Sequence, residues 1–269
     1  MLRSFKKYFI RTLAVYLLLC CGFYFFQHLF FFHPKVLPVD YRFFFTQKFE
    51  EKQMVLDEKT MIDIVQFKPK DSVAKGVVLY FHGNRKNIER YAEYAPNFTK
   101  YGYECWMVDY PGYGKSTGEL TQEVIQNMAI KLYDVAIQKY KSTEVVIYGK
   151  SLGTGFAAYL ASIKDSKQLI LETPYYSMAS LAHRYVPFLP VSVLLKMNFT
   201  TGAYFNTIIE PITIFHGLQD EVIPFTNAMQ LMPGMKKGDR FVSIPDGIHN
   251  DLPSKIMYQT TLDSLMQLP

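Results

Sequence analysis

Short apolar segments alternate with longer helix-forming segments along most of this chain of 269 residues. The apolar segments are rich in β-branched residues and alternate poorly with polar ones, which is typical of strands buried on both faces of a sheet. They cover residues 61–67, 76–81, 103–108, 144–148, 168–171, 212–215 and 241–244. The helix-length stretches are 87–100, 121–140 and 152–164. Strands that alternate with helices predict an α/β fold with a mostly parallel central sheet and flanking helices.

A long apolar segment precedes this pattern. Residues 12–32 are interrupted only by Gln27 and His28, and a helix of that length reaches about the 30 Å of a bilayer core. Four basic residues and no acidic residue come before it: Arg3, Lys6, Lys7 and Arg11. The positive-inside rule then predicts a cytoplasmic N-terminus and an extracytoplasmic remainder, periplasmic or luminal. Residues 1–33 are therefore predicted to be a basic tail and a single-pass membrane anchor.

Two other interpretations of this segment stay open. A cleaved signal peptide has a similar apolar core, but bulky phenylalanines occupy the expected cleavage zone and no A-x-A-like site follows. Lipidation of Cys20 or Cys21 is the second alternative, although no small residue precedes either cysteine. The uncleaved anchor remains the favoured interpretation.

The charged residues and cysteines exclude several classes of partner. The formal net charge is +5, but the four basic residues before the apolar segment carry most of it, since 25 basic and 24 acidic residues remain. We therefore expect no nucleic-acid partner. Three cysteines cannot build a disulfide scaffold, and none is spaced for a zinc cage. The sequence predicts neither a metal nor a cofactor.

The segment Gly-Lys-Ser-Leu-Gly at 149–153 lies between an expected strand and an expected helix. A nucleophile elbow requires this context, because a sharp strand-to-helix turn exposes the serine at the edge of the sheet. The two glycines are needed because such a turn leaves no room for side chains two positions either side of the serine. Ser151 is the predicted nucleophile.

A serine nucleophile needs a histidine base and a carboxylate that orients the base. Asp220 follows the strand at 212–215, and His249 lies on a loop after the strand at 241–244. Asp220 and His249 thus follow Ser151 in the chain order Ser, Asp, His that accompanies a nucleophile elbow. The backbone N–H groups of Asn84 and Leu152 are the predicted oxyanion hole.

Other residues compete for these roles. Glu172 and Glu221 compete with Asp220, but Glu172 is expected to be a structural acid. Asp109 follows a strand too, and the turn after it favours a hydrogen-bonding role. Three further histidines, His82, His183 and His216, compete with His249. We expect His82 and His216 to satisfy backbone groups and His183 to be a solvated or lid-packing residue.

These motifs resemble the α/β-hydrolase superfamily, and more closely its BEM46-like, ABHD13-type membrane-anchored branch. The resemblance covers about residues 55–257. It is carried by YFHGN at 80–84, DYPGYGKSTG at 109–118, YGKSLGTG at 148–155, ETPYYSM at 172–178, YVPFLP at 185–190, HGLQDEVIP at 216–224 and GIHND at 247–251. Two departures are Arg85-Lys86 in place of small residues, and GIHND in place of Gly-x-Gly-His. The resemblance implies an α/β-hydrolase fold in which Ser151, His249 and Asp220 are nucleophile, base and acid.

The sequence thus predicts a hydrolase domain at 34–269 with a lid insertion at about 176–210. The expected function is membrane-anchored cleavage of lipid-derived acyl esters or thioesters; the membrane and a small-molecule or lipid acyl substrate are the expected partners. A plain carboxylesterase, a peptidase, an acyltransferase with the same triad and an inactive binding or scaffold protein stay open, as does the oligomeric state. Arg85 and Lys86 are either a solvated pair or a site for an anionic head group. No other substrate-binding residue is assigned.

Overall fold

An eight-stranded sheet runs through the protein in the computed structural model, which describes residues 2–70 and 73–267. Its strand order is β10-β9-β8-β7-β4-β6-β3-β2. The strands are β2 (Phe49–Val55), β3 (Met61–Phe67), β4 (Gly76–Phe81), β6 (Tyr103–Val108), β7 (Val145–Lys150), β8 (Gln168–Glu172), β9 (Ile212–Gly217) and β10 (Arg240–Ile244). Strands from β10 to β6 pair in parallel, whereas β3 pairs antiparallel with both β6 and β2. The predicted α/β fold with a mostly parallel sheet is confirmed.

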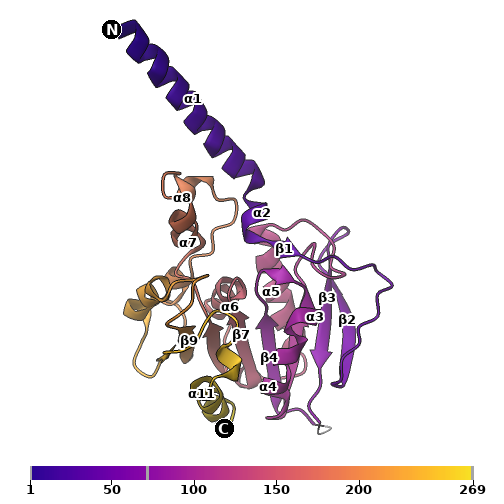
Figure 1. Ribbon diagram of the computed structural model, residues 1–269. Helices are drawn as coiled ribbons and strands as arrows, with labels where there is room; N and C mark the ends of the chain where they lie inside the picture. Colours follow the sequence, from indigo (N-terminus) through magenta and orange to yellow (C-terminus); the bar gives the residue numbers. More distant parts are fainter. Residues whose placement is uncertain (1, 71–72, 268–269) are drawn as a thin grey trace.

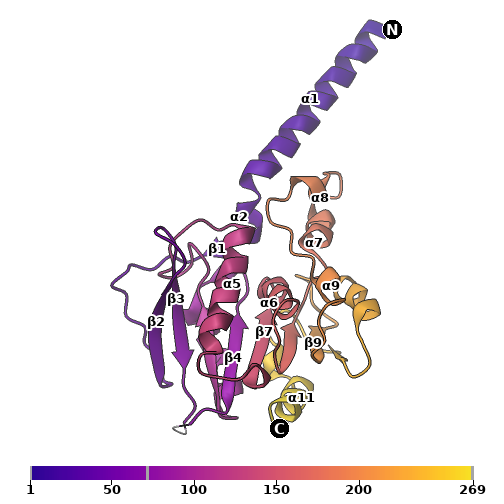
Figure 2. The same cartoon turned by 180° about the vertical axis from the view of Figure 1, so that it is seen from behind.

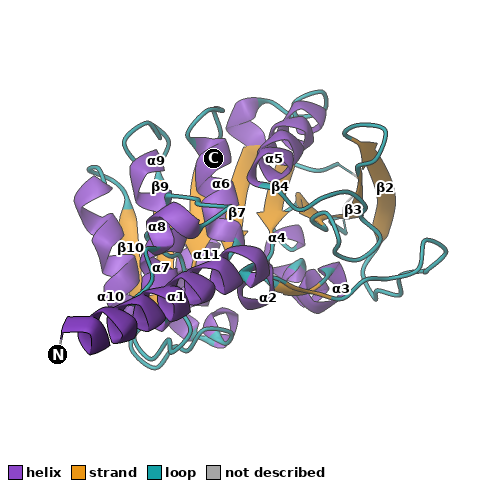
Figure 3. Ribbon diagram, turned by 90° about the horizontal axis from the view of Figure 1, so that it is seen from above, coloured by secondary structure: helices purple, strands orange, loops and turns teal. Residues whose placement is uncertain are grey.

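Helices cover both faces of this sheet (Figures 2 and 3). The longer ones are α5 (Gln122–Ala136), α6 (Gly153–Ala161), α7 (Met178–Tyr185) and α11 (Ile256–Gln267). The short ones are α3 (Ile88–Tyr91), α4 (Pro96–Thr99), α8 (Val191–Leu194), α9 (Thr201–Tyr204) and α10 (Phe225–Ala228), with 3-10 turns at Ala92–Tyr94, Ser142–Glu144, Met229–Gly234 and Leu252–Ser254. Apolar side chains of α5 and α6 form a core on one face, and those of α3, α4 and α11 form a second core on the other.

Two elements differ from the sequence prediction. The expected helix at 87–100 is broken into α3, a 3-10 turn and α4, because Pro96 has no backbone N–H and begins a new helix. The edge strand β2 was not predicted. Most of its residues are polar and exposed, so a search for buried apolar segments passes over it.

The N-terminal helix α1 (Leu2–Phe26) projects from the domain, and the short helix α2 (His28–Phe31) joins it to the rest of the chain (Figure 1). Within the described residues, Ser4–Phe26 is the one helix that is long and apolar enough to cross a membrane. A two-residue strand, β1 (His33–Pro34), then pairs with β5 (Arg85–Lys86) beside the sheet. Residue 1 of the predicted anchor and residues 268 and 269 of the predicted hydrolase domain lie outside the described residues. The side chain of Arg3 lies outside them as well.

The irregular segment at 176–210 connects β8 to β9, which are adjacent parallel strands. It contains α7, α8 and α9. Helices α7 and α8 lie at the end of the molecule from which α1 emerges (Figure 1). We call the segment with α7 and α8, residues 176–196, the cap.

Candidate active site

Ser151 occupies the sharp turn between β7 and α6. Its φ is +51°, a left-handed backbone conformation that costs free energy for any residue but glycine. A side chain at Gly149 would place its Cβ 2.6 Å from the Gly153 carbonyl oxygen, and one at Gly153 would lie 2.1 Å from the Phe81 carbonyl oxygen. Glycine at both positions therefore lets the backbone segments around the serine approach each other closely, as the nucleophile elbow requires.

A hydrogen-bond chain joins the three residues singled out from the sequence. The His249 Nε2 lies 2.9 Å from the Ser151 Oγ, and its Nδ1 lies 2.7 Å from the Asp220 Oδ2. All three residues are buried, with 5–8% of their surfaces exposed. They come from the ends of three separate segments, after β7, β9 and β10, which the parallel sheet brings to one edge.

Backbone groups fix the carboxylate of Asp220 so that one oxygen is left for the histidine. Its Oδ1 accepts hydrogen bonds from the N–H groups of Val222 (2.9 Å) and Ile223 (2.8 Å). His216 also lies near Asp220, but burial lowers the pKa of its imidazole. The His216 Nε2 lies 2.9 Å from the Ile223 carbonyl oxygen and 3.6 Å from the Asp220 Oδ2. The shorter contact of Asp220 is the one with His249.

The competing acids and histidines have other partners. His82 Nδ1 lies 2.7 Å from the Gly83 carbonyl oxygen, and its ring stacks on Tyr110. Asp109 accepts the backbone N–H of Ile88 at 2.9 Å, and burial raises its pKa. His183 is exposed on α7. These residues occupy the structural positions that the sequence analysis expected.

A buried ion pair lies under the elbow. Lys150, the residue before the serine, is paired with Glu172 at the end of β8, and at most 2% of either side chain is exposed. The Glu172 carboxylate also accepts the hydroxyl of Tyr148, and its backbone carbonyl accepts the Ser151 N–H at 2.9 Å. Sequence reasoning identified Glu172 as structural but missed its partner. The sequence feature that could have indicated this partner is a lysine between two buried elements, because an unpaired charge would be costly there.

The expected oxyanion-hole residues flank the serine. Asn84 and Leu152 both line the pocket into which Ser151 opens. Leu152 is the N-cap residue of α6, and the N-terminal end of a helix favours negative charge. A Cβ at Gly83, next to Asn84, would lie 2.8 Å from the Tyr91 hydroxyl and 3.5 Å from the Ser151 Cβ. Glycine at this position lets the loop after β4 come close to the serine.

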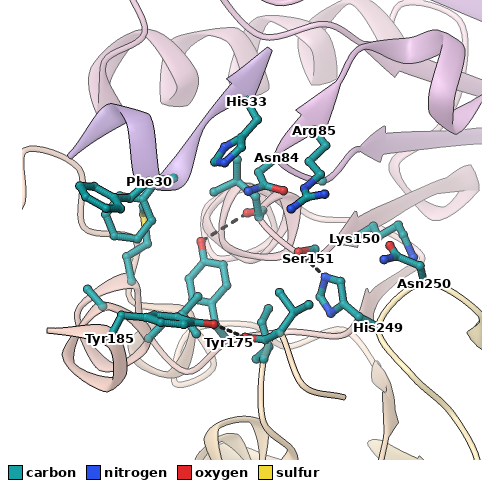
Figure 4. A pocket seen from close by; sticks show the side chains of 18 of the residues that line it. Phe30, His33, Asn84, Arg85, Lys150, Ser151, Tyr175, Tyr185, His249 and Asn250 are labelled. Carbon is teal, nitrogen blue, oxygen red and sulfur yellow. Dashed lines mark hydrogen bonds between the residues drawn. The ribbon is translucent and has the colours of Figure 1, made fainter. Parts of the chain in front are cut away.

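The pocket has a volume of about 510 Å³ and an apolar wall opposite the serine. Figure 4 shows Ser151 and His249 on one side, with Phe30 and Tyr185 on the other. The apolar lining comes from the cap and from the N-terminal helices: Met178, Leu181, Ala182, Tyr185 and Val186, with Phe23, Phe30 and Phe31. The contribution of α1 and α2 was missed, because the sequence treats an apolar N-terminal segment as a membrane anchor only.

Two arginines line the polar side of this pocket. They are Arg85, on β5, and Arg90, on α3. Lys86, which the sequence analysis grouped with Arg85, is exposed and outside the pocket lining. The basic pair at the pocket is thus Arg85 with Arg90. Among the described residues, no group of histidine, cysteine and acidic side chains is arranged to hold a metal ion.

Known proteins resemble this chain in sequence. The profile of the serine aminopeptidase S33 family (Hydrolase_4) matches residues 72–203. An uncharacterized protein of Mycobacterium tuberculosis (strain ATCC 25618 / H37Rv) is 26% identical over 195 residues, 70% of this chain and 67% of that protein. The lysophosphatidylserine lipase ABHD12 of Danio rerio is 28% identical over 169 residues, 55% of this chain and 44% of the lipase. The match spans less than half of the lipase.

Solved structures resemble it in fold. The esterase Pf2001 of Pyrococcus furiosus superposes with a TM-score of 0.66 at 16% identity, covering 88% of this chain and 97% of the esterase. The 2,6-dihydroxy-pseudo-oxynicotine hydrolase superposes with a TM-score of 0.67 at 16% identity, covering 82% and 68% of the two chains.

The sheet order, the serine at the strand-to-helix turn and these likenesses identify the chain as a member of the α/β-hydrolase superfamily. Within that superfamily it is a hydrolase. The superfamily resemblance and the fold predicted from the sequence are confirmed.

Proposed function

We propose that this hydrolase cleaves acyl esters or thioesters of lipid origin with Ser151, His249 and Asp220 as its catalytic triad. The observation that carries the proposal is the unbroken hydrogen-bond chain from Asp220 through His249 to Ser151, with distances of 2.7 and 2.9 Å. Ser151 and His249 line a pocket whose opposite wall is apolar, and such a wall suits an acyl chain.

The reaction follows from the atoms that the chain contributes. His249 Nε2 takes the proton of the Ser151 hydroxyl as the Oγ bonds to the acyl carbon, and the carbonyl becomes an oxyanion. The N–H groups of Asn84 and Leu152 stabilise that charge. The imidazolium, held by Asp220, then gives its proton to the leaving alcohol or thiol as the acyl-enzyme forms. A water molecule then attacks the acyl-enzyme in the same way, with His249 taking its proton. The acyl group is released as the free acid, and the serine hydroxyl is restored.

The substrate class is supported by the pocket and by one relative. Arg85 and Arg90 bring two positive charges to the wall of the pocket, while the cap and the N-terminal helices supply apolar surface. The relative from Danio rerio is a lysophosphatidylserine lipase, so an anionic, lipid-derived ester is a reasonable substrate here. An anionic head group beside the arginines would leave the acyl chain on the apolar side.

Alanine at Arg85 or Arg90 is therefore expected to weaken the binding of anionic esters selectively. A charge-assisted hydrogen bond contributes about 1.5–3 kcal/mol, so the ratio of KM for an anionic ester to KM for a neutral ester of the same chain length should rise about tenfold or more. Steady-state kinetics with both esters measures this ratio. Lys86→Ala is the matched control, because it removes a neighbouring charge outside the pocket lining. Equal ratios in all the variants would contradict the assignment.

Membrane attachment through α1 is part of the same proposal. The helix is largely exposed, and its basic residues all lie in its N-terminal part, before the apolar part begins at residue 12. This order supports an anchor with a cytoplasmic N-terminus and an extracytoplasmic domain. A tether of this kind would hold the active site beside the lipids on which it acts. The domain boundary near residue 33 and a lid role for the cap belong to the proposal as well.

Product analysis tests the reaction itself. The purified full-length chain is given a fatty acyl ester with and without an added alcohol, and the products are identified by mass spectrometry. We expect free fatty acid in both samples. Transfer of the acyl group to the added alcohol in preference to water would show an acyltransferase instead. No turnover by a folded protein across a panel of acyl lengths and head groups would favour a binding or scaffold role.

A further inference from the structure

The wall of the pocket opposite Ser151 is built in part by the segment proposed as the membrane anchor. Phe23 near the end of α1, with Phe30 and Phe31 on α2, lines the same pocket as Ser151 and His249. Figure 4 shows Phe30 across the pocket from the serine. Phe23 is buried against the cap, where it packs with Ala182, Leu189 and Val191. The N-terminal helix is thus a structural part of the pocket.

Hydrogen bonds of Gln27 connect this wall to the cap. This residue is one of the two polar residues that interrupt the apolar segment, and only 5% of its surface is exposed. Its Nε2 donates to the carbonyl oxygen of Leu194 at 3.0 Å, and its Oε1 accepts the backbone N–H of Lys196 at 2.9 Å. A polar side chain is costly in an apolar setting unless it is hydrogen-bonded. Both ends of this amide are used to hold the cap against the helix.

Both the helix and the cap expose large apolar side chains. Phe25 and Phe26 are 57% exposed on α1, Phe188 is 62% exposed and Val193 is 80% exposed on the cap. Lys196 lies at the junction, with its Nζ 4.7 Å from the centre of the Tyr24 ring. An aromatic ring with a lysine above it is typical of the boundary between hydrocarbon and head groups. Both α1 and the cap therefore present large apolar side chains on the surface of the protein.

Phe30 itself is exposed to 66% although it lines the pocket. Its ring stacks on that of Phe23, with centroids 6.4 Å apart. The two rings form a continuous apolar surface that begins at the buried contact between α1 and the cap and ends at the pocket. An acyl chain that follows this surface would contact aromatic rings on its way to the serine.

We propose that the end of the N-terminal helix and α2 form the acyl-chain wall of the active site, so that Phe30 and Phe31 determine the preference for long acyl chains. The inference rests on the proposed esterase function. It assigns the anchor a second role: the helix that tethers the domain also receives the acyl chain, and Gln27 is the positioning residue that keeps this wall closed against the cap.

The test is the chain-length preference of the full-length protein in phosphatidylcholine nanodiscs. For each variant, kcat/KM is measured for a palmitoyl and a butyryl ester of the same alcohol. Phe30→Ala and Phe31→Ala should each lower the ratio of palmitoyl to butyryl kcat/KM by about tenfold, because part of the apolar contact with a long chain is lost. Phe26→Ala is the matched control, since Phe26 is an exposed aromatic residue at the end of α1, outside the pocket lining. Its ratio should stay at the wild-type value.

A second measurement covers variants with reduced turnover. The rates of labelling by a long-alkyl and a short-alkyl fluorophosphonate give the same ratio in a single chemical step. An unchanged ratio in both phenylalanine variants, while butyryl ester is still hydrolysed, would overturn this inference and leave the proposed function standing. An equal fall in Phe26→Ala would also overturn it. Absence of both turnover and labelling in the wild-type protein would overturn the proposed function and this inference with it.

Discussion

Replacing Ser151 or His249 with alanine is expected to lower kcat for acyl ester hydrolysis by about 10⁶-fold, and Asp220→Asn by about 10⁴-fold. Alanine at 151 removes the oxygen that attacks the acyl carbon, and alanine at 249 removes the base 2.9 Å from it. Asparagine at 220 keeps the shape of the side chain but loses the charge that orients the imidazole and stabilises its protonated form. Initial rates with a chromogenic short-chain ester measure these losses.

Two features of the data would separate a triad from a general loss of structure. The effects should be non-additive, because the three residues act as a unit and the Ser151→Ala, His249→Ala double variant should be no slower than either single variant. His183→Ala should keep wild-type kinetics, because that histidine is exposed on α7 and outside the pocket lining. A Ser151→Ala protein that retains more than a small fraction of its activity would contradict the assignment.

The second large effect concerns stability. Removing either member of the Lys150–Glu172 pair, as in Lys150→Met or Glu172→Gln, should lower the free energy of unfolding by about 3–5 kcal/mol, because the other charge is left buried without its partner. The pair connects the residue before Ser151 to the end of β8, and the Tyr148 and Tyr258 hydroxyls complete the site. Chemical denaturation of the full-length protein in detergent micelles measures the change.

Two comparisons test that explanation. The double variant Lys150→Met, Glu172→Gln should lose clearly less stability than the sum of the two single losses, because no unpaired charge remains. Lys164→Ala is the exposed control. This variant breaks the ion pair between Lys164 and Asp134, whose side chains are 28% and 46% exposed, respectively. It should lower the free energy of unfolding by at most about 1 kcal/mol. Additive losses in the double variant would show that the pair does not act as a unit.

Most of the fold was predictable from the sequence because buried parallel strands leave a strong signal. Each apolar segment forms a strand of the sheet, and Thr121 caps α5 by accepting the Val124 N–H at 3.2 Å. The edge strand β2 was missed because an edge strand with exposed faces needs few apolar residues. The break at Pro96 shows that a stretch of helix-forming residues need not be one helix.

The candidate site was predictable where it depends on chain order and was missed where it depends on packing. The order Ser151, Asp220, His249 and the strand-end positions are properties of the sequence. The aromatic wall from Phe23 and Phe30 is not, because an apolar N-terminal segment is equally consistent with a helix that never contacts the domain. The sequence also could not show that Arg90, and not Lys86, lies beside Arg85 at the pocket. Lys86 adopts a left-handed backbone conformation with a φ of +64° and is exposed, while α3 places Arg90 in the pocket lining.

Active-site labelling tests whether Ser151 is an activated nucleophile. The full-length protein is treated with a fluorophosphonate and digested, and the modified peptides are identified by mass spectrometry. We predict a single stoichiometric adduct on Ser151, absent from Ser151→Ala and strongly slowed in His249→Ala. A folded wild-type protein that forms no adduct, or forms it on another serine, would contradict the account.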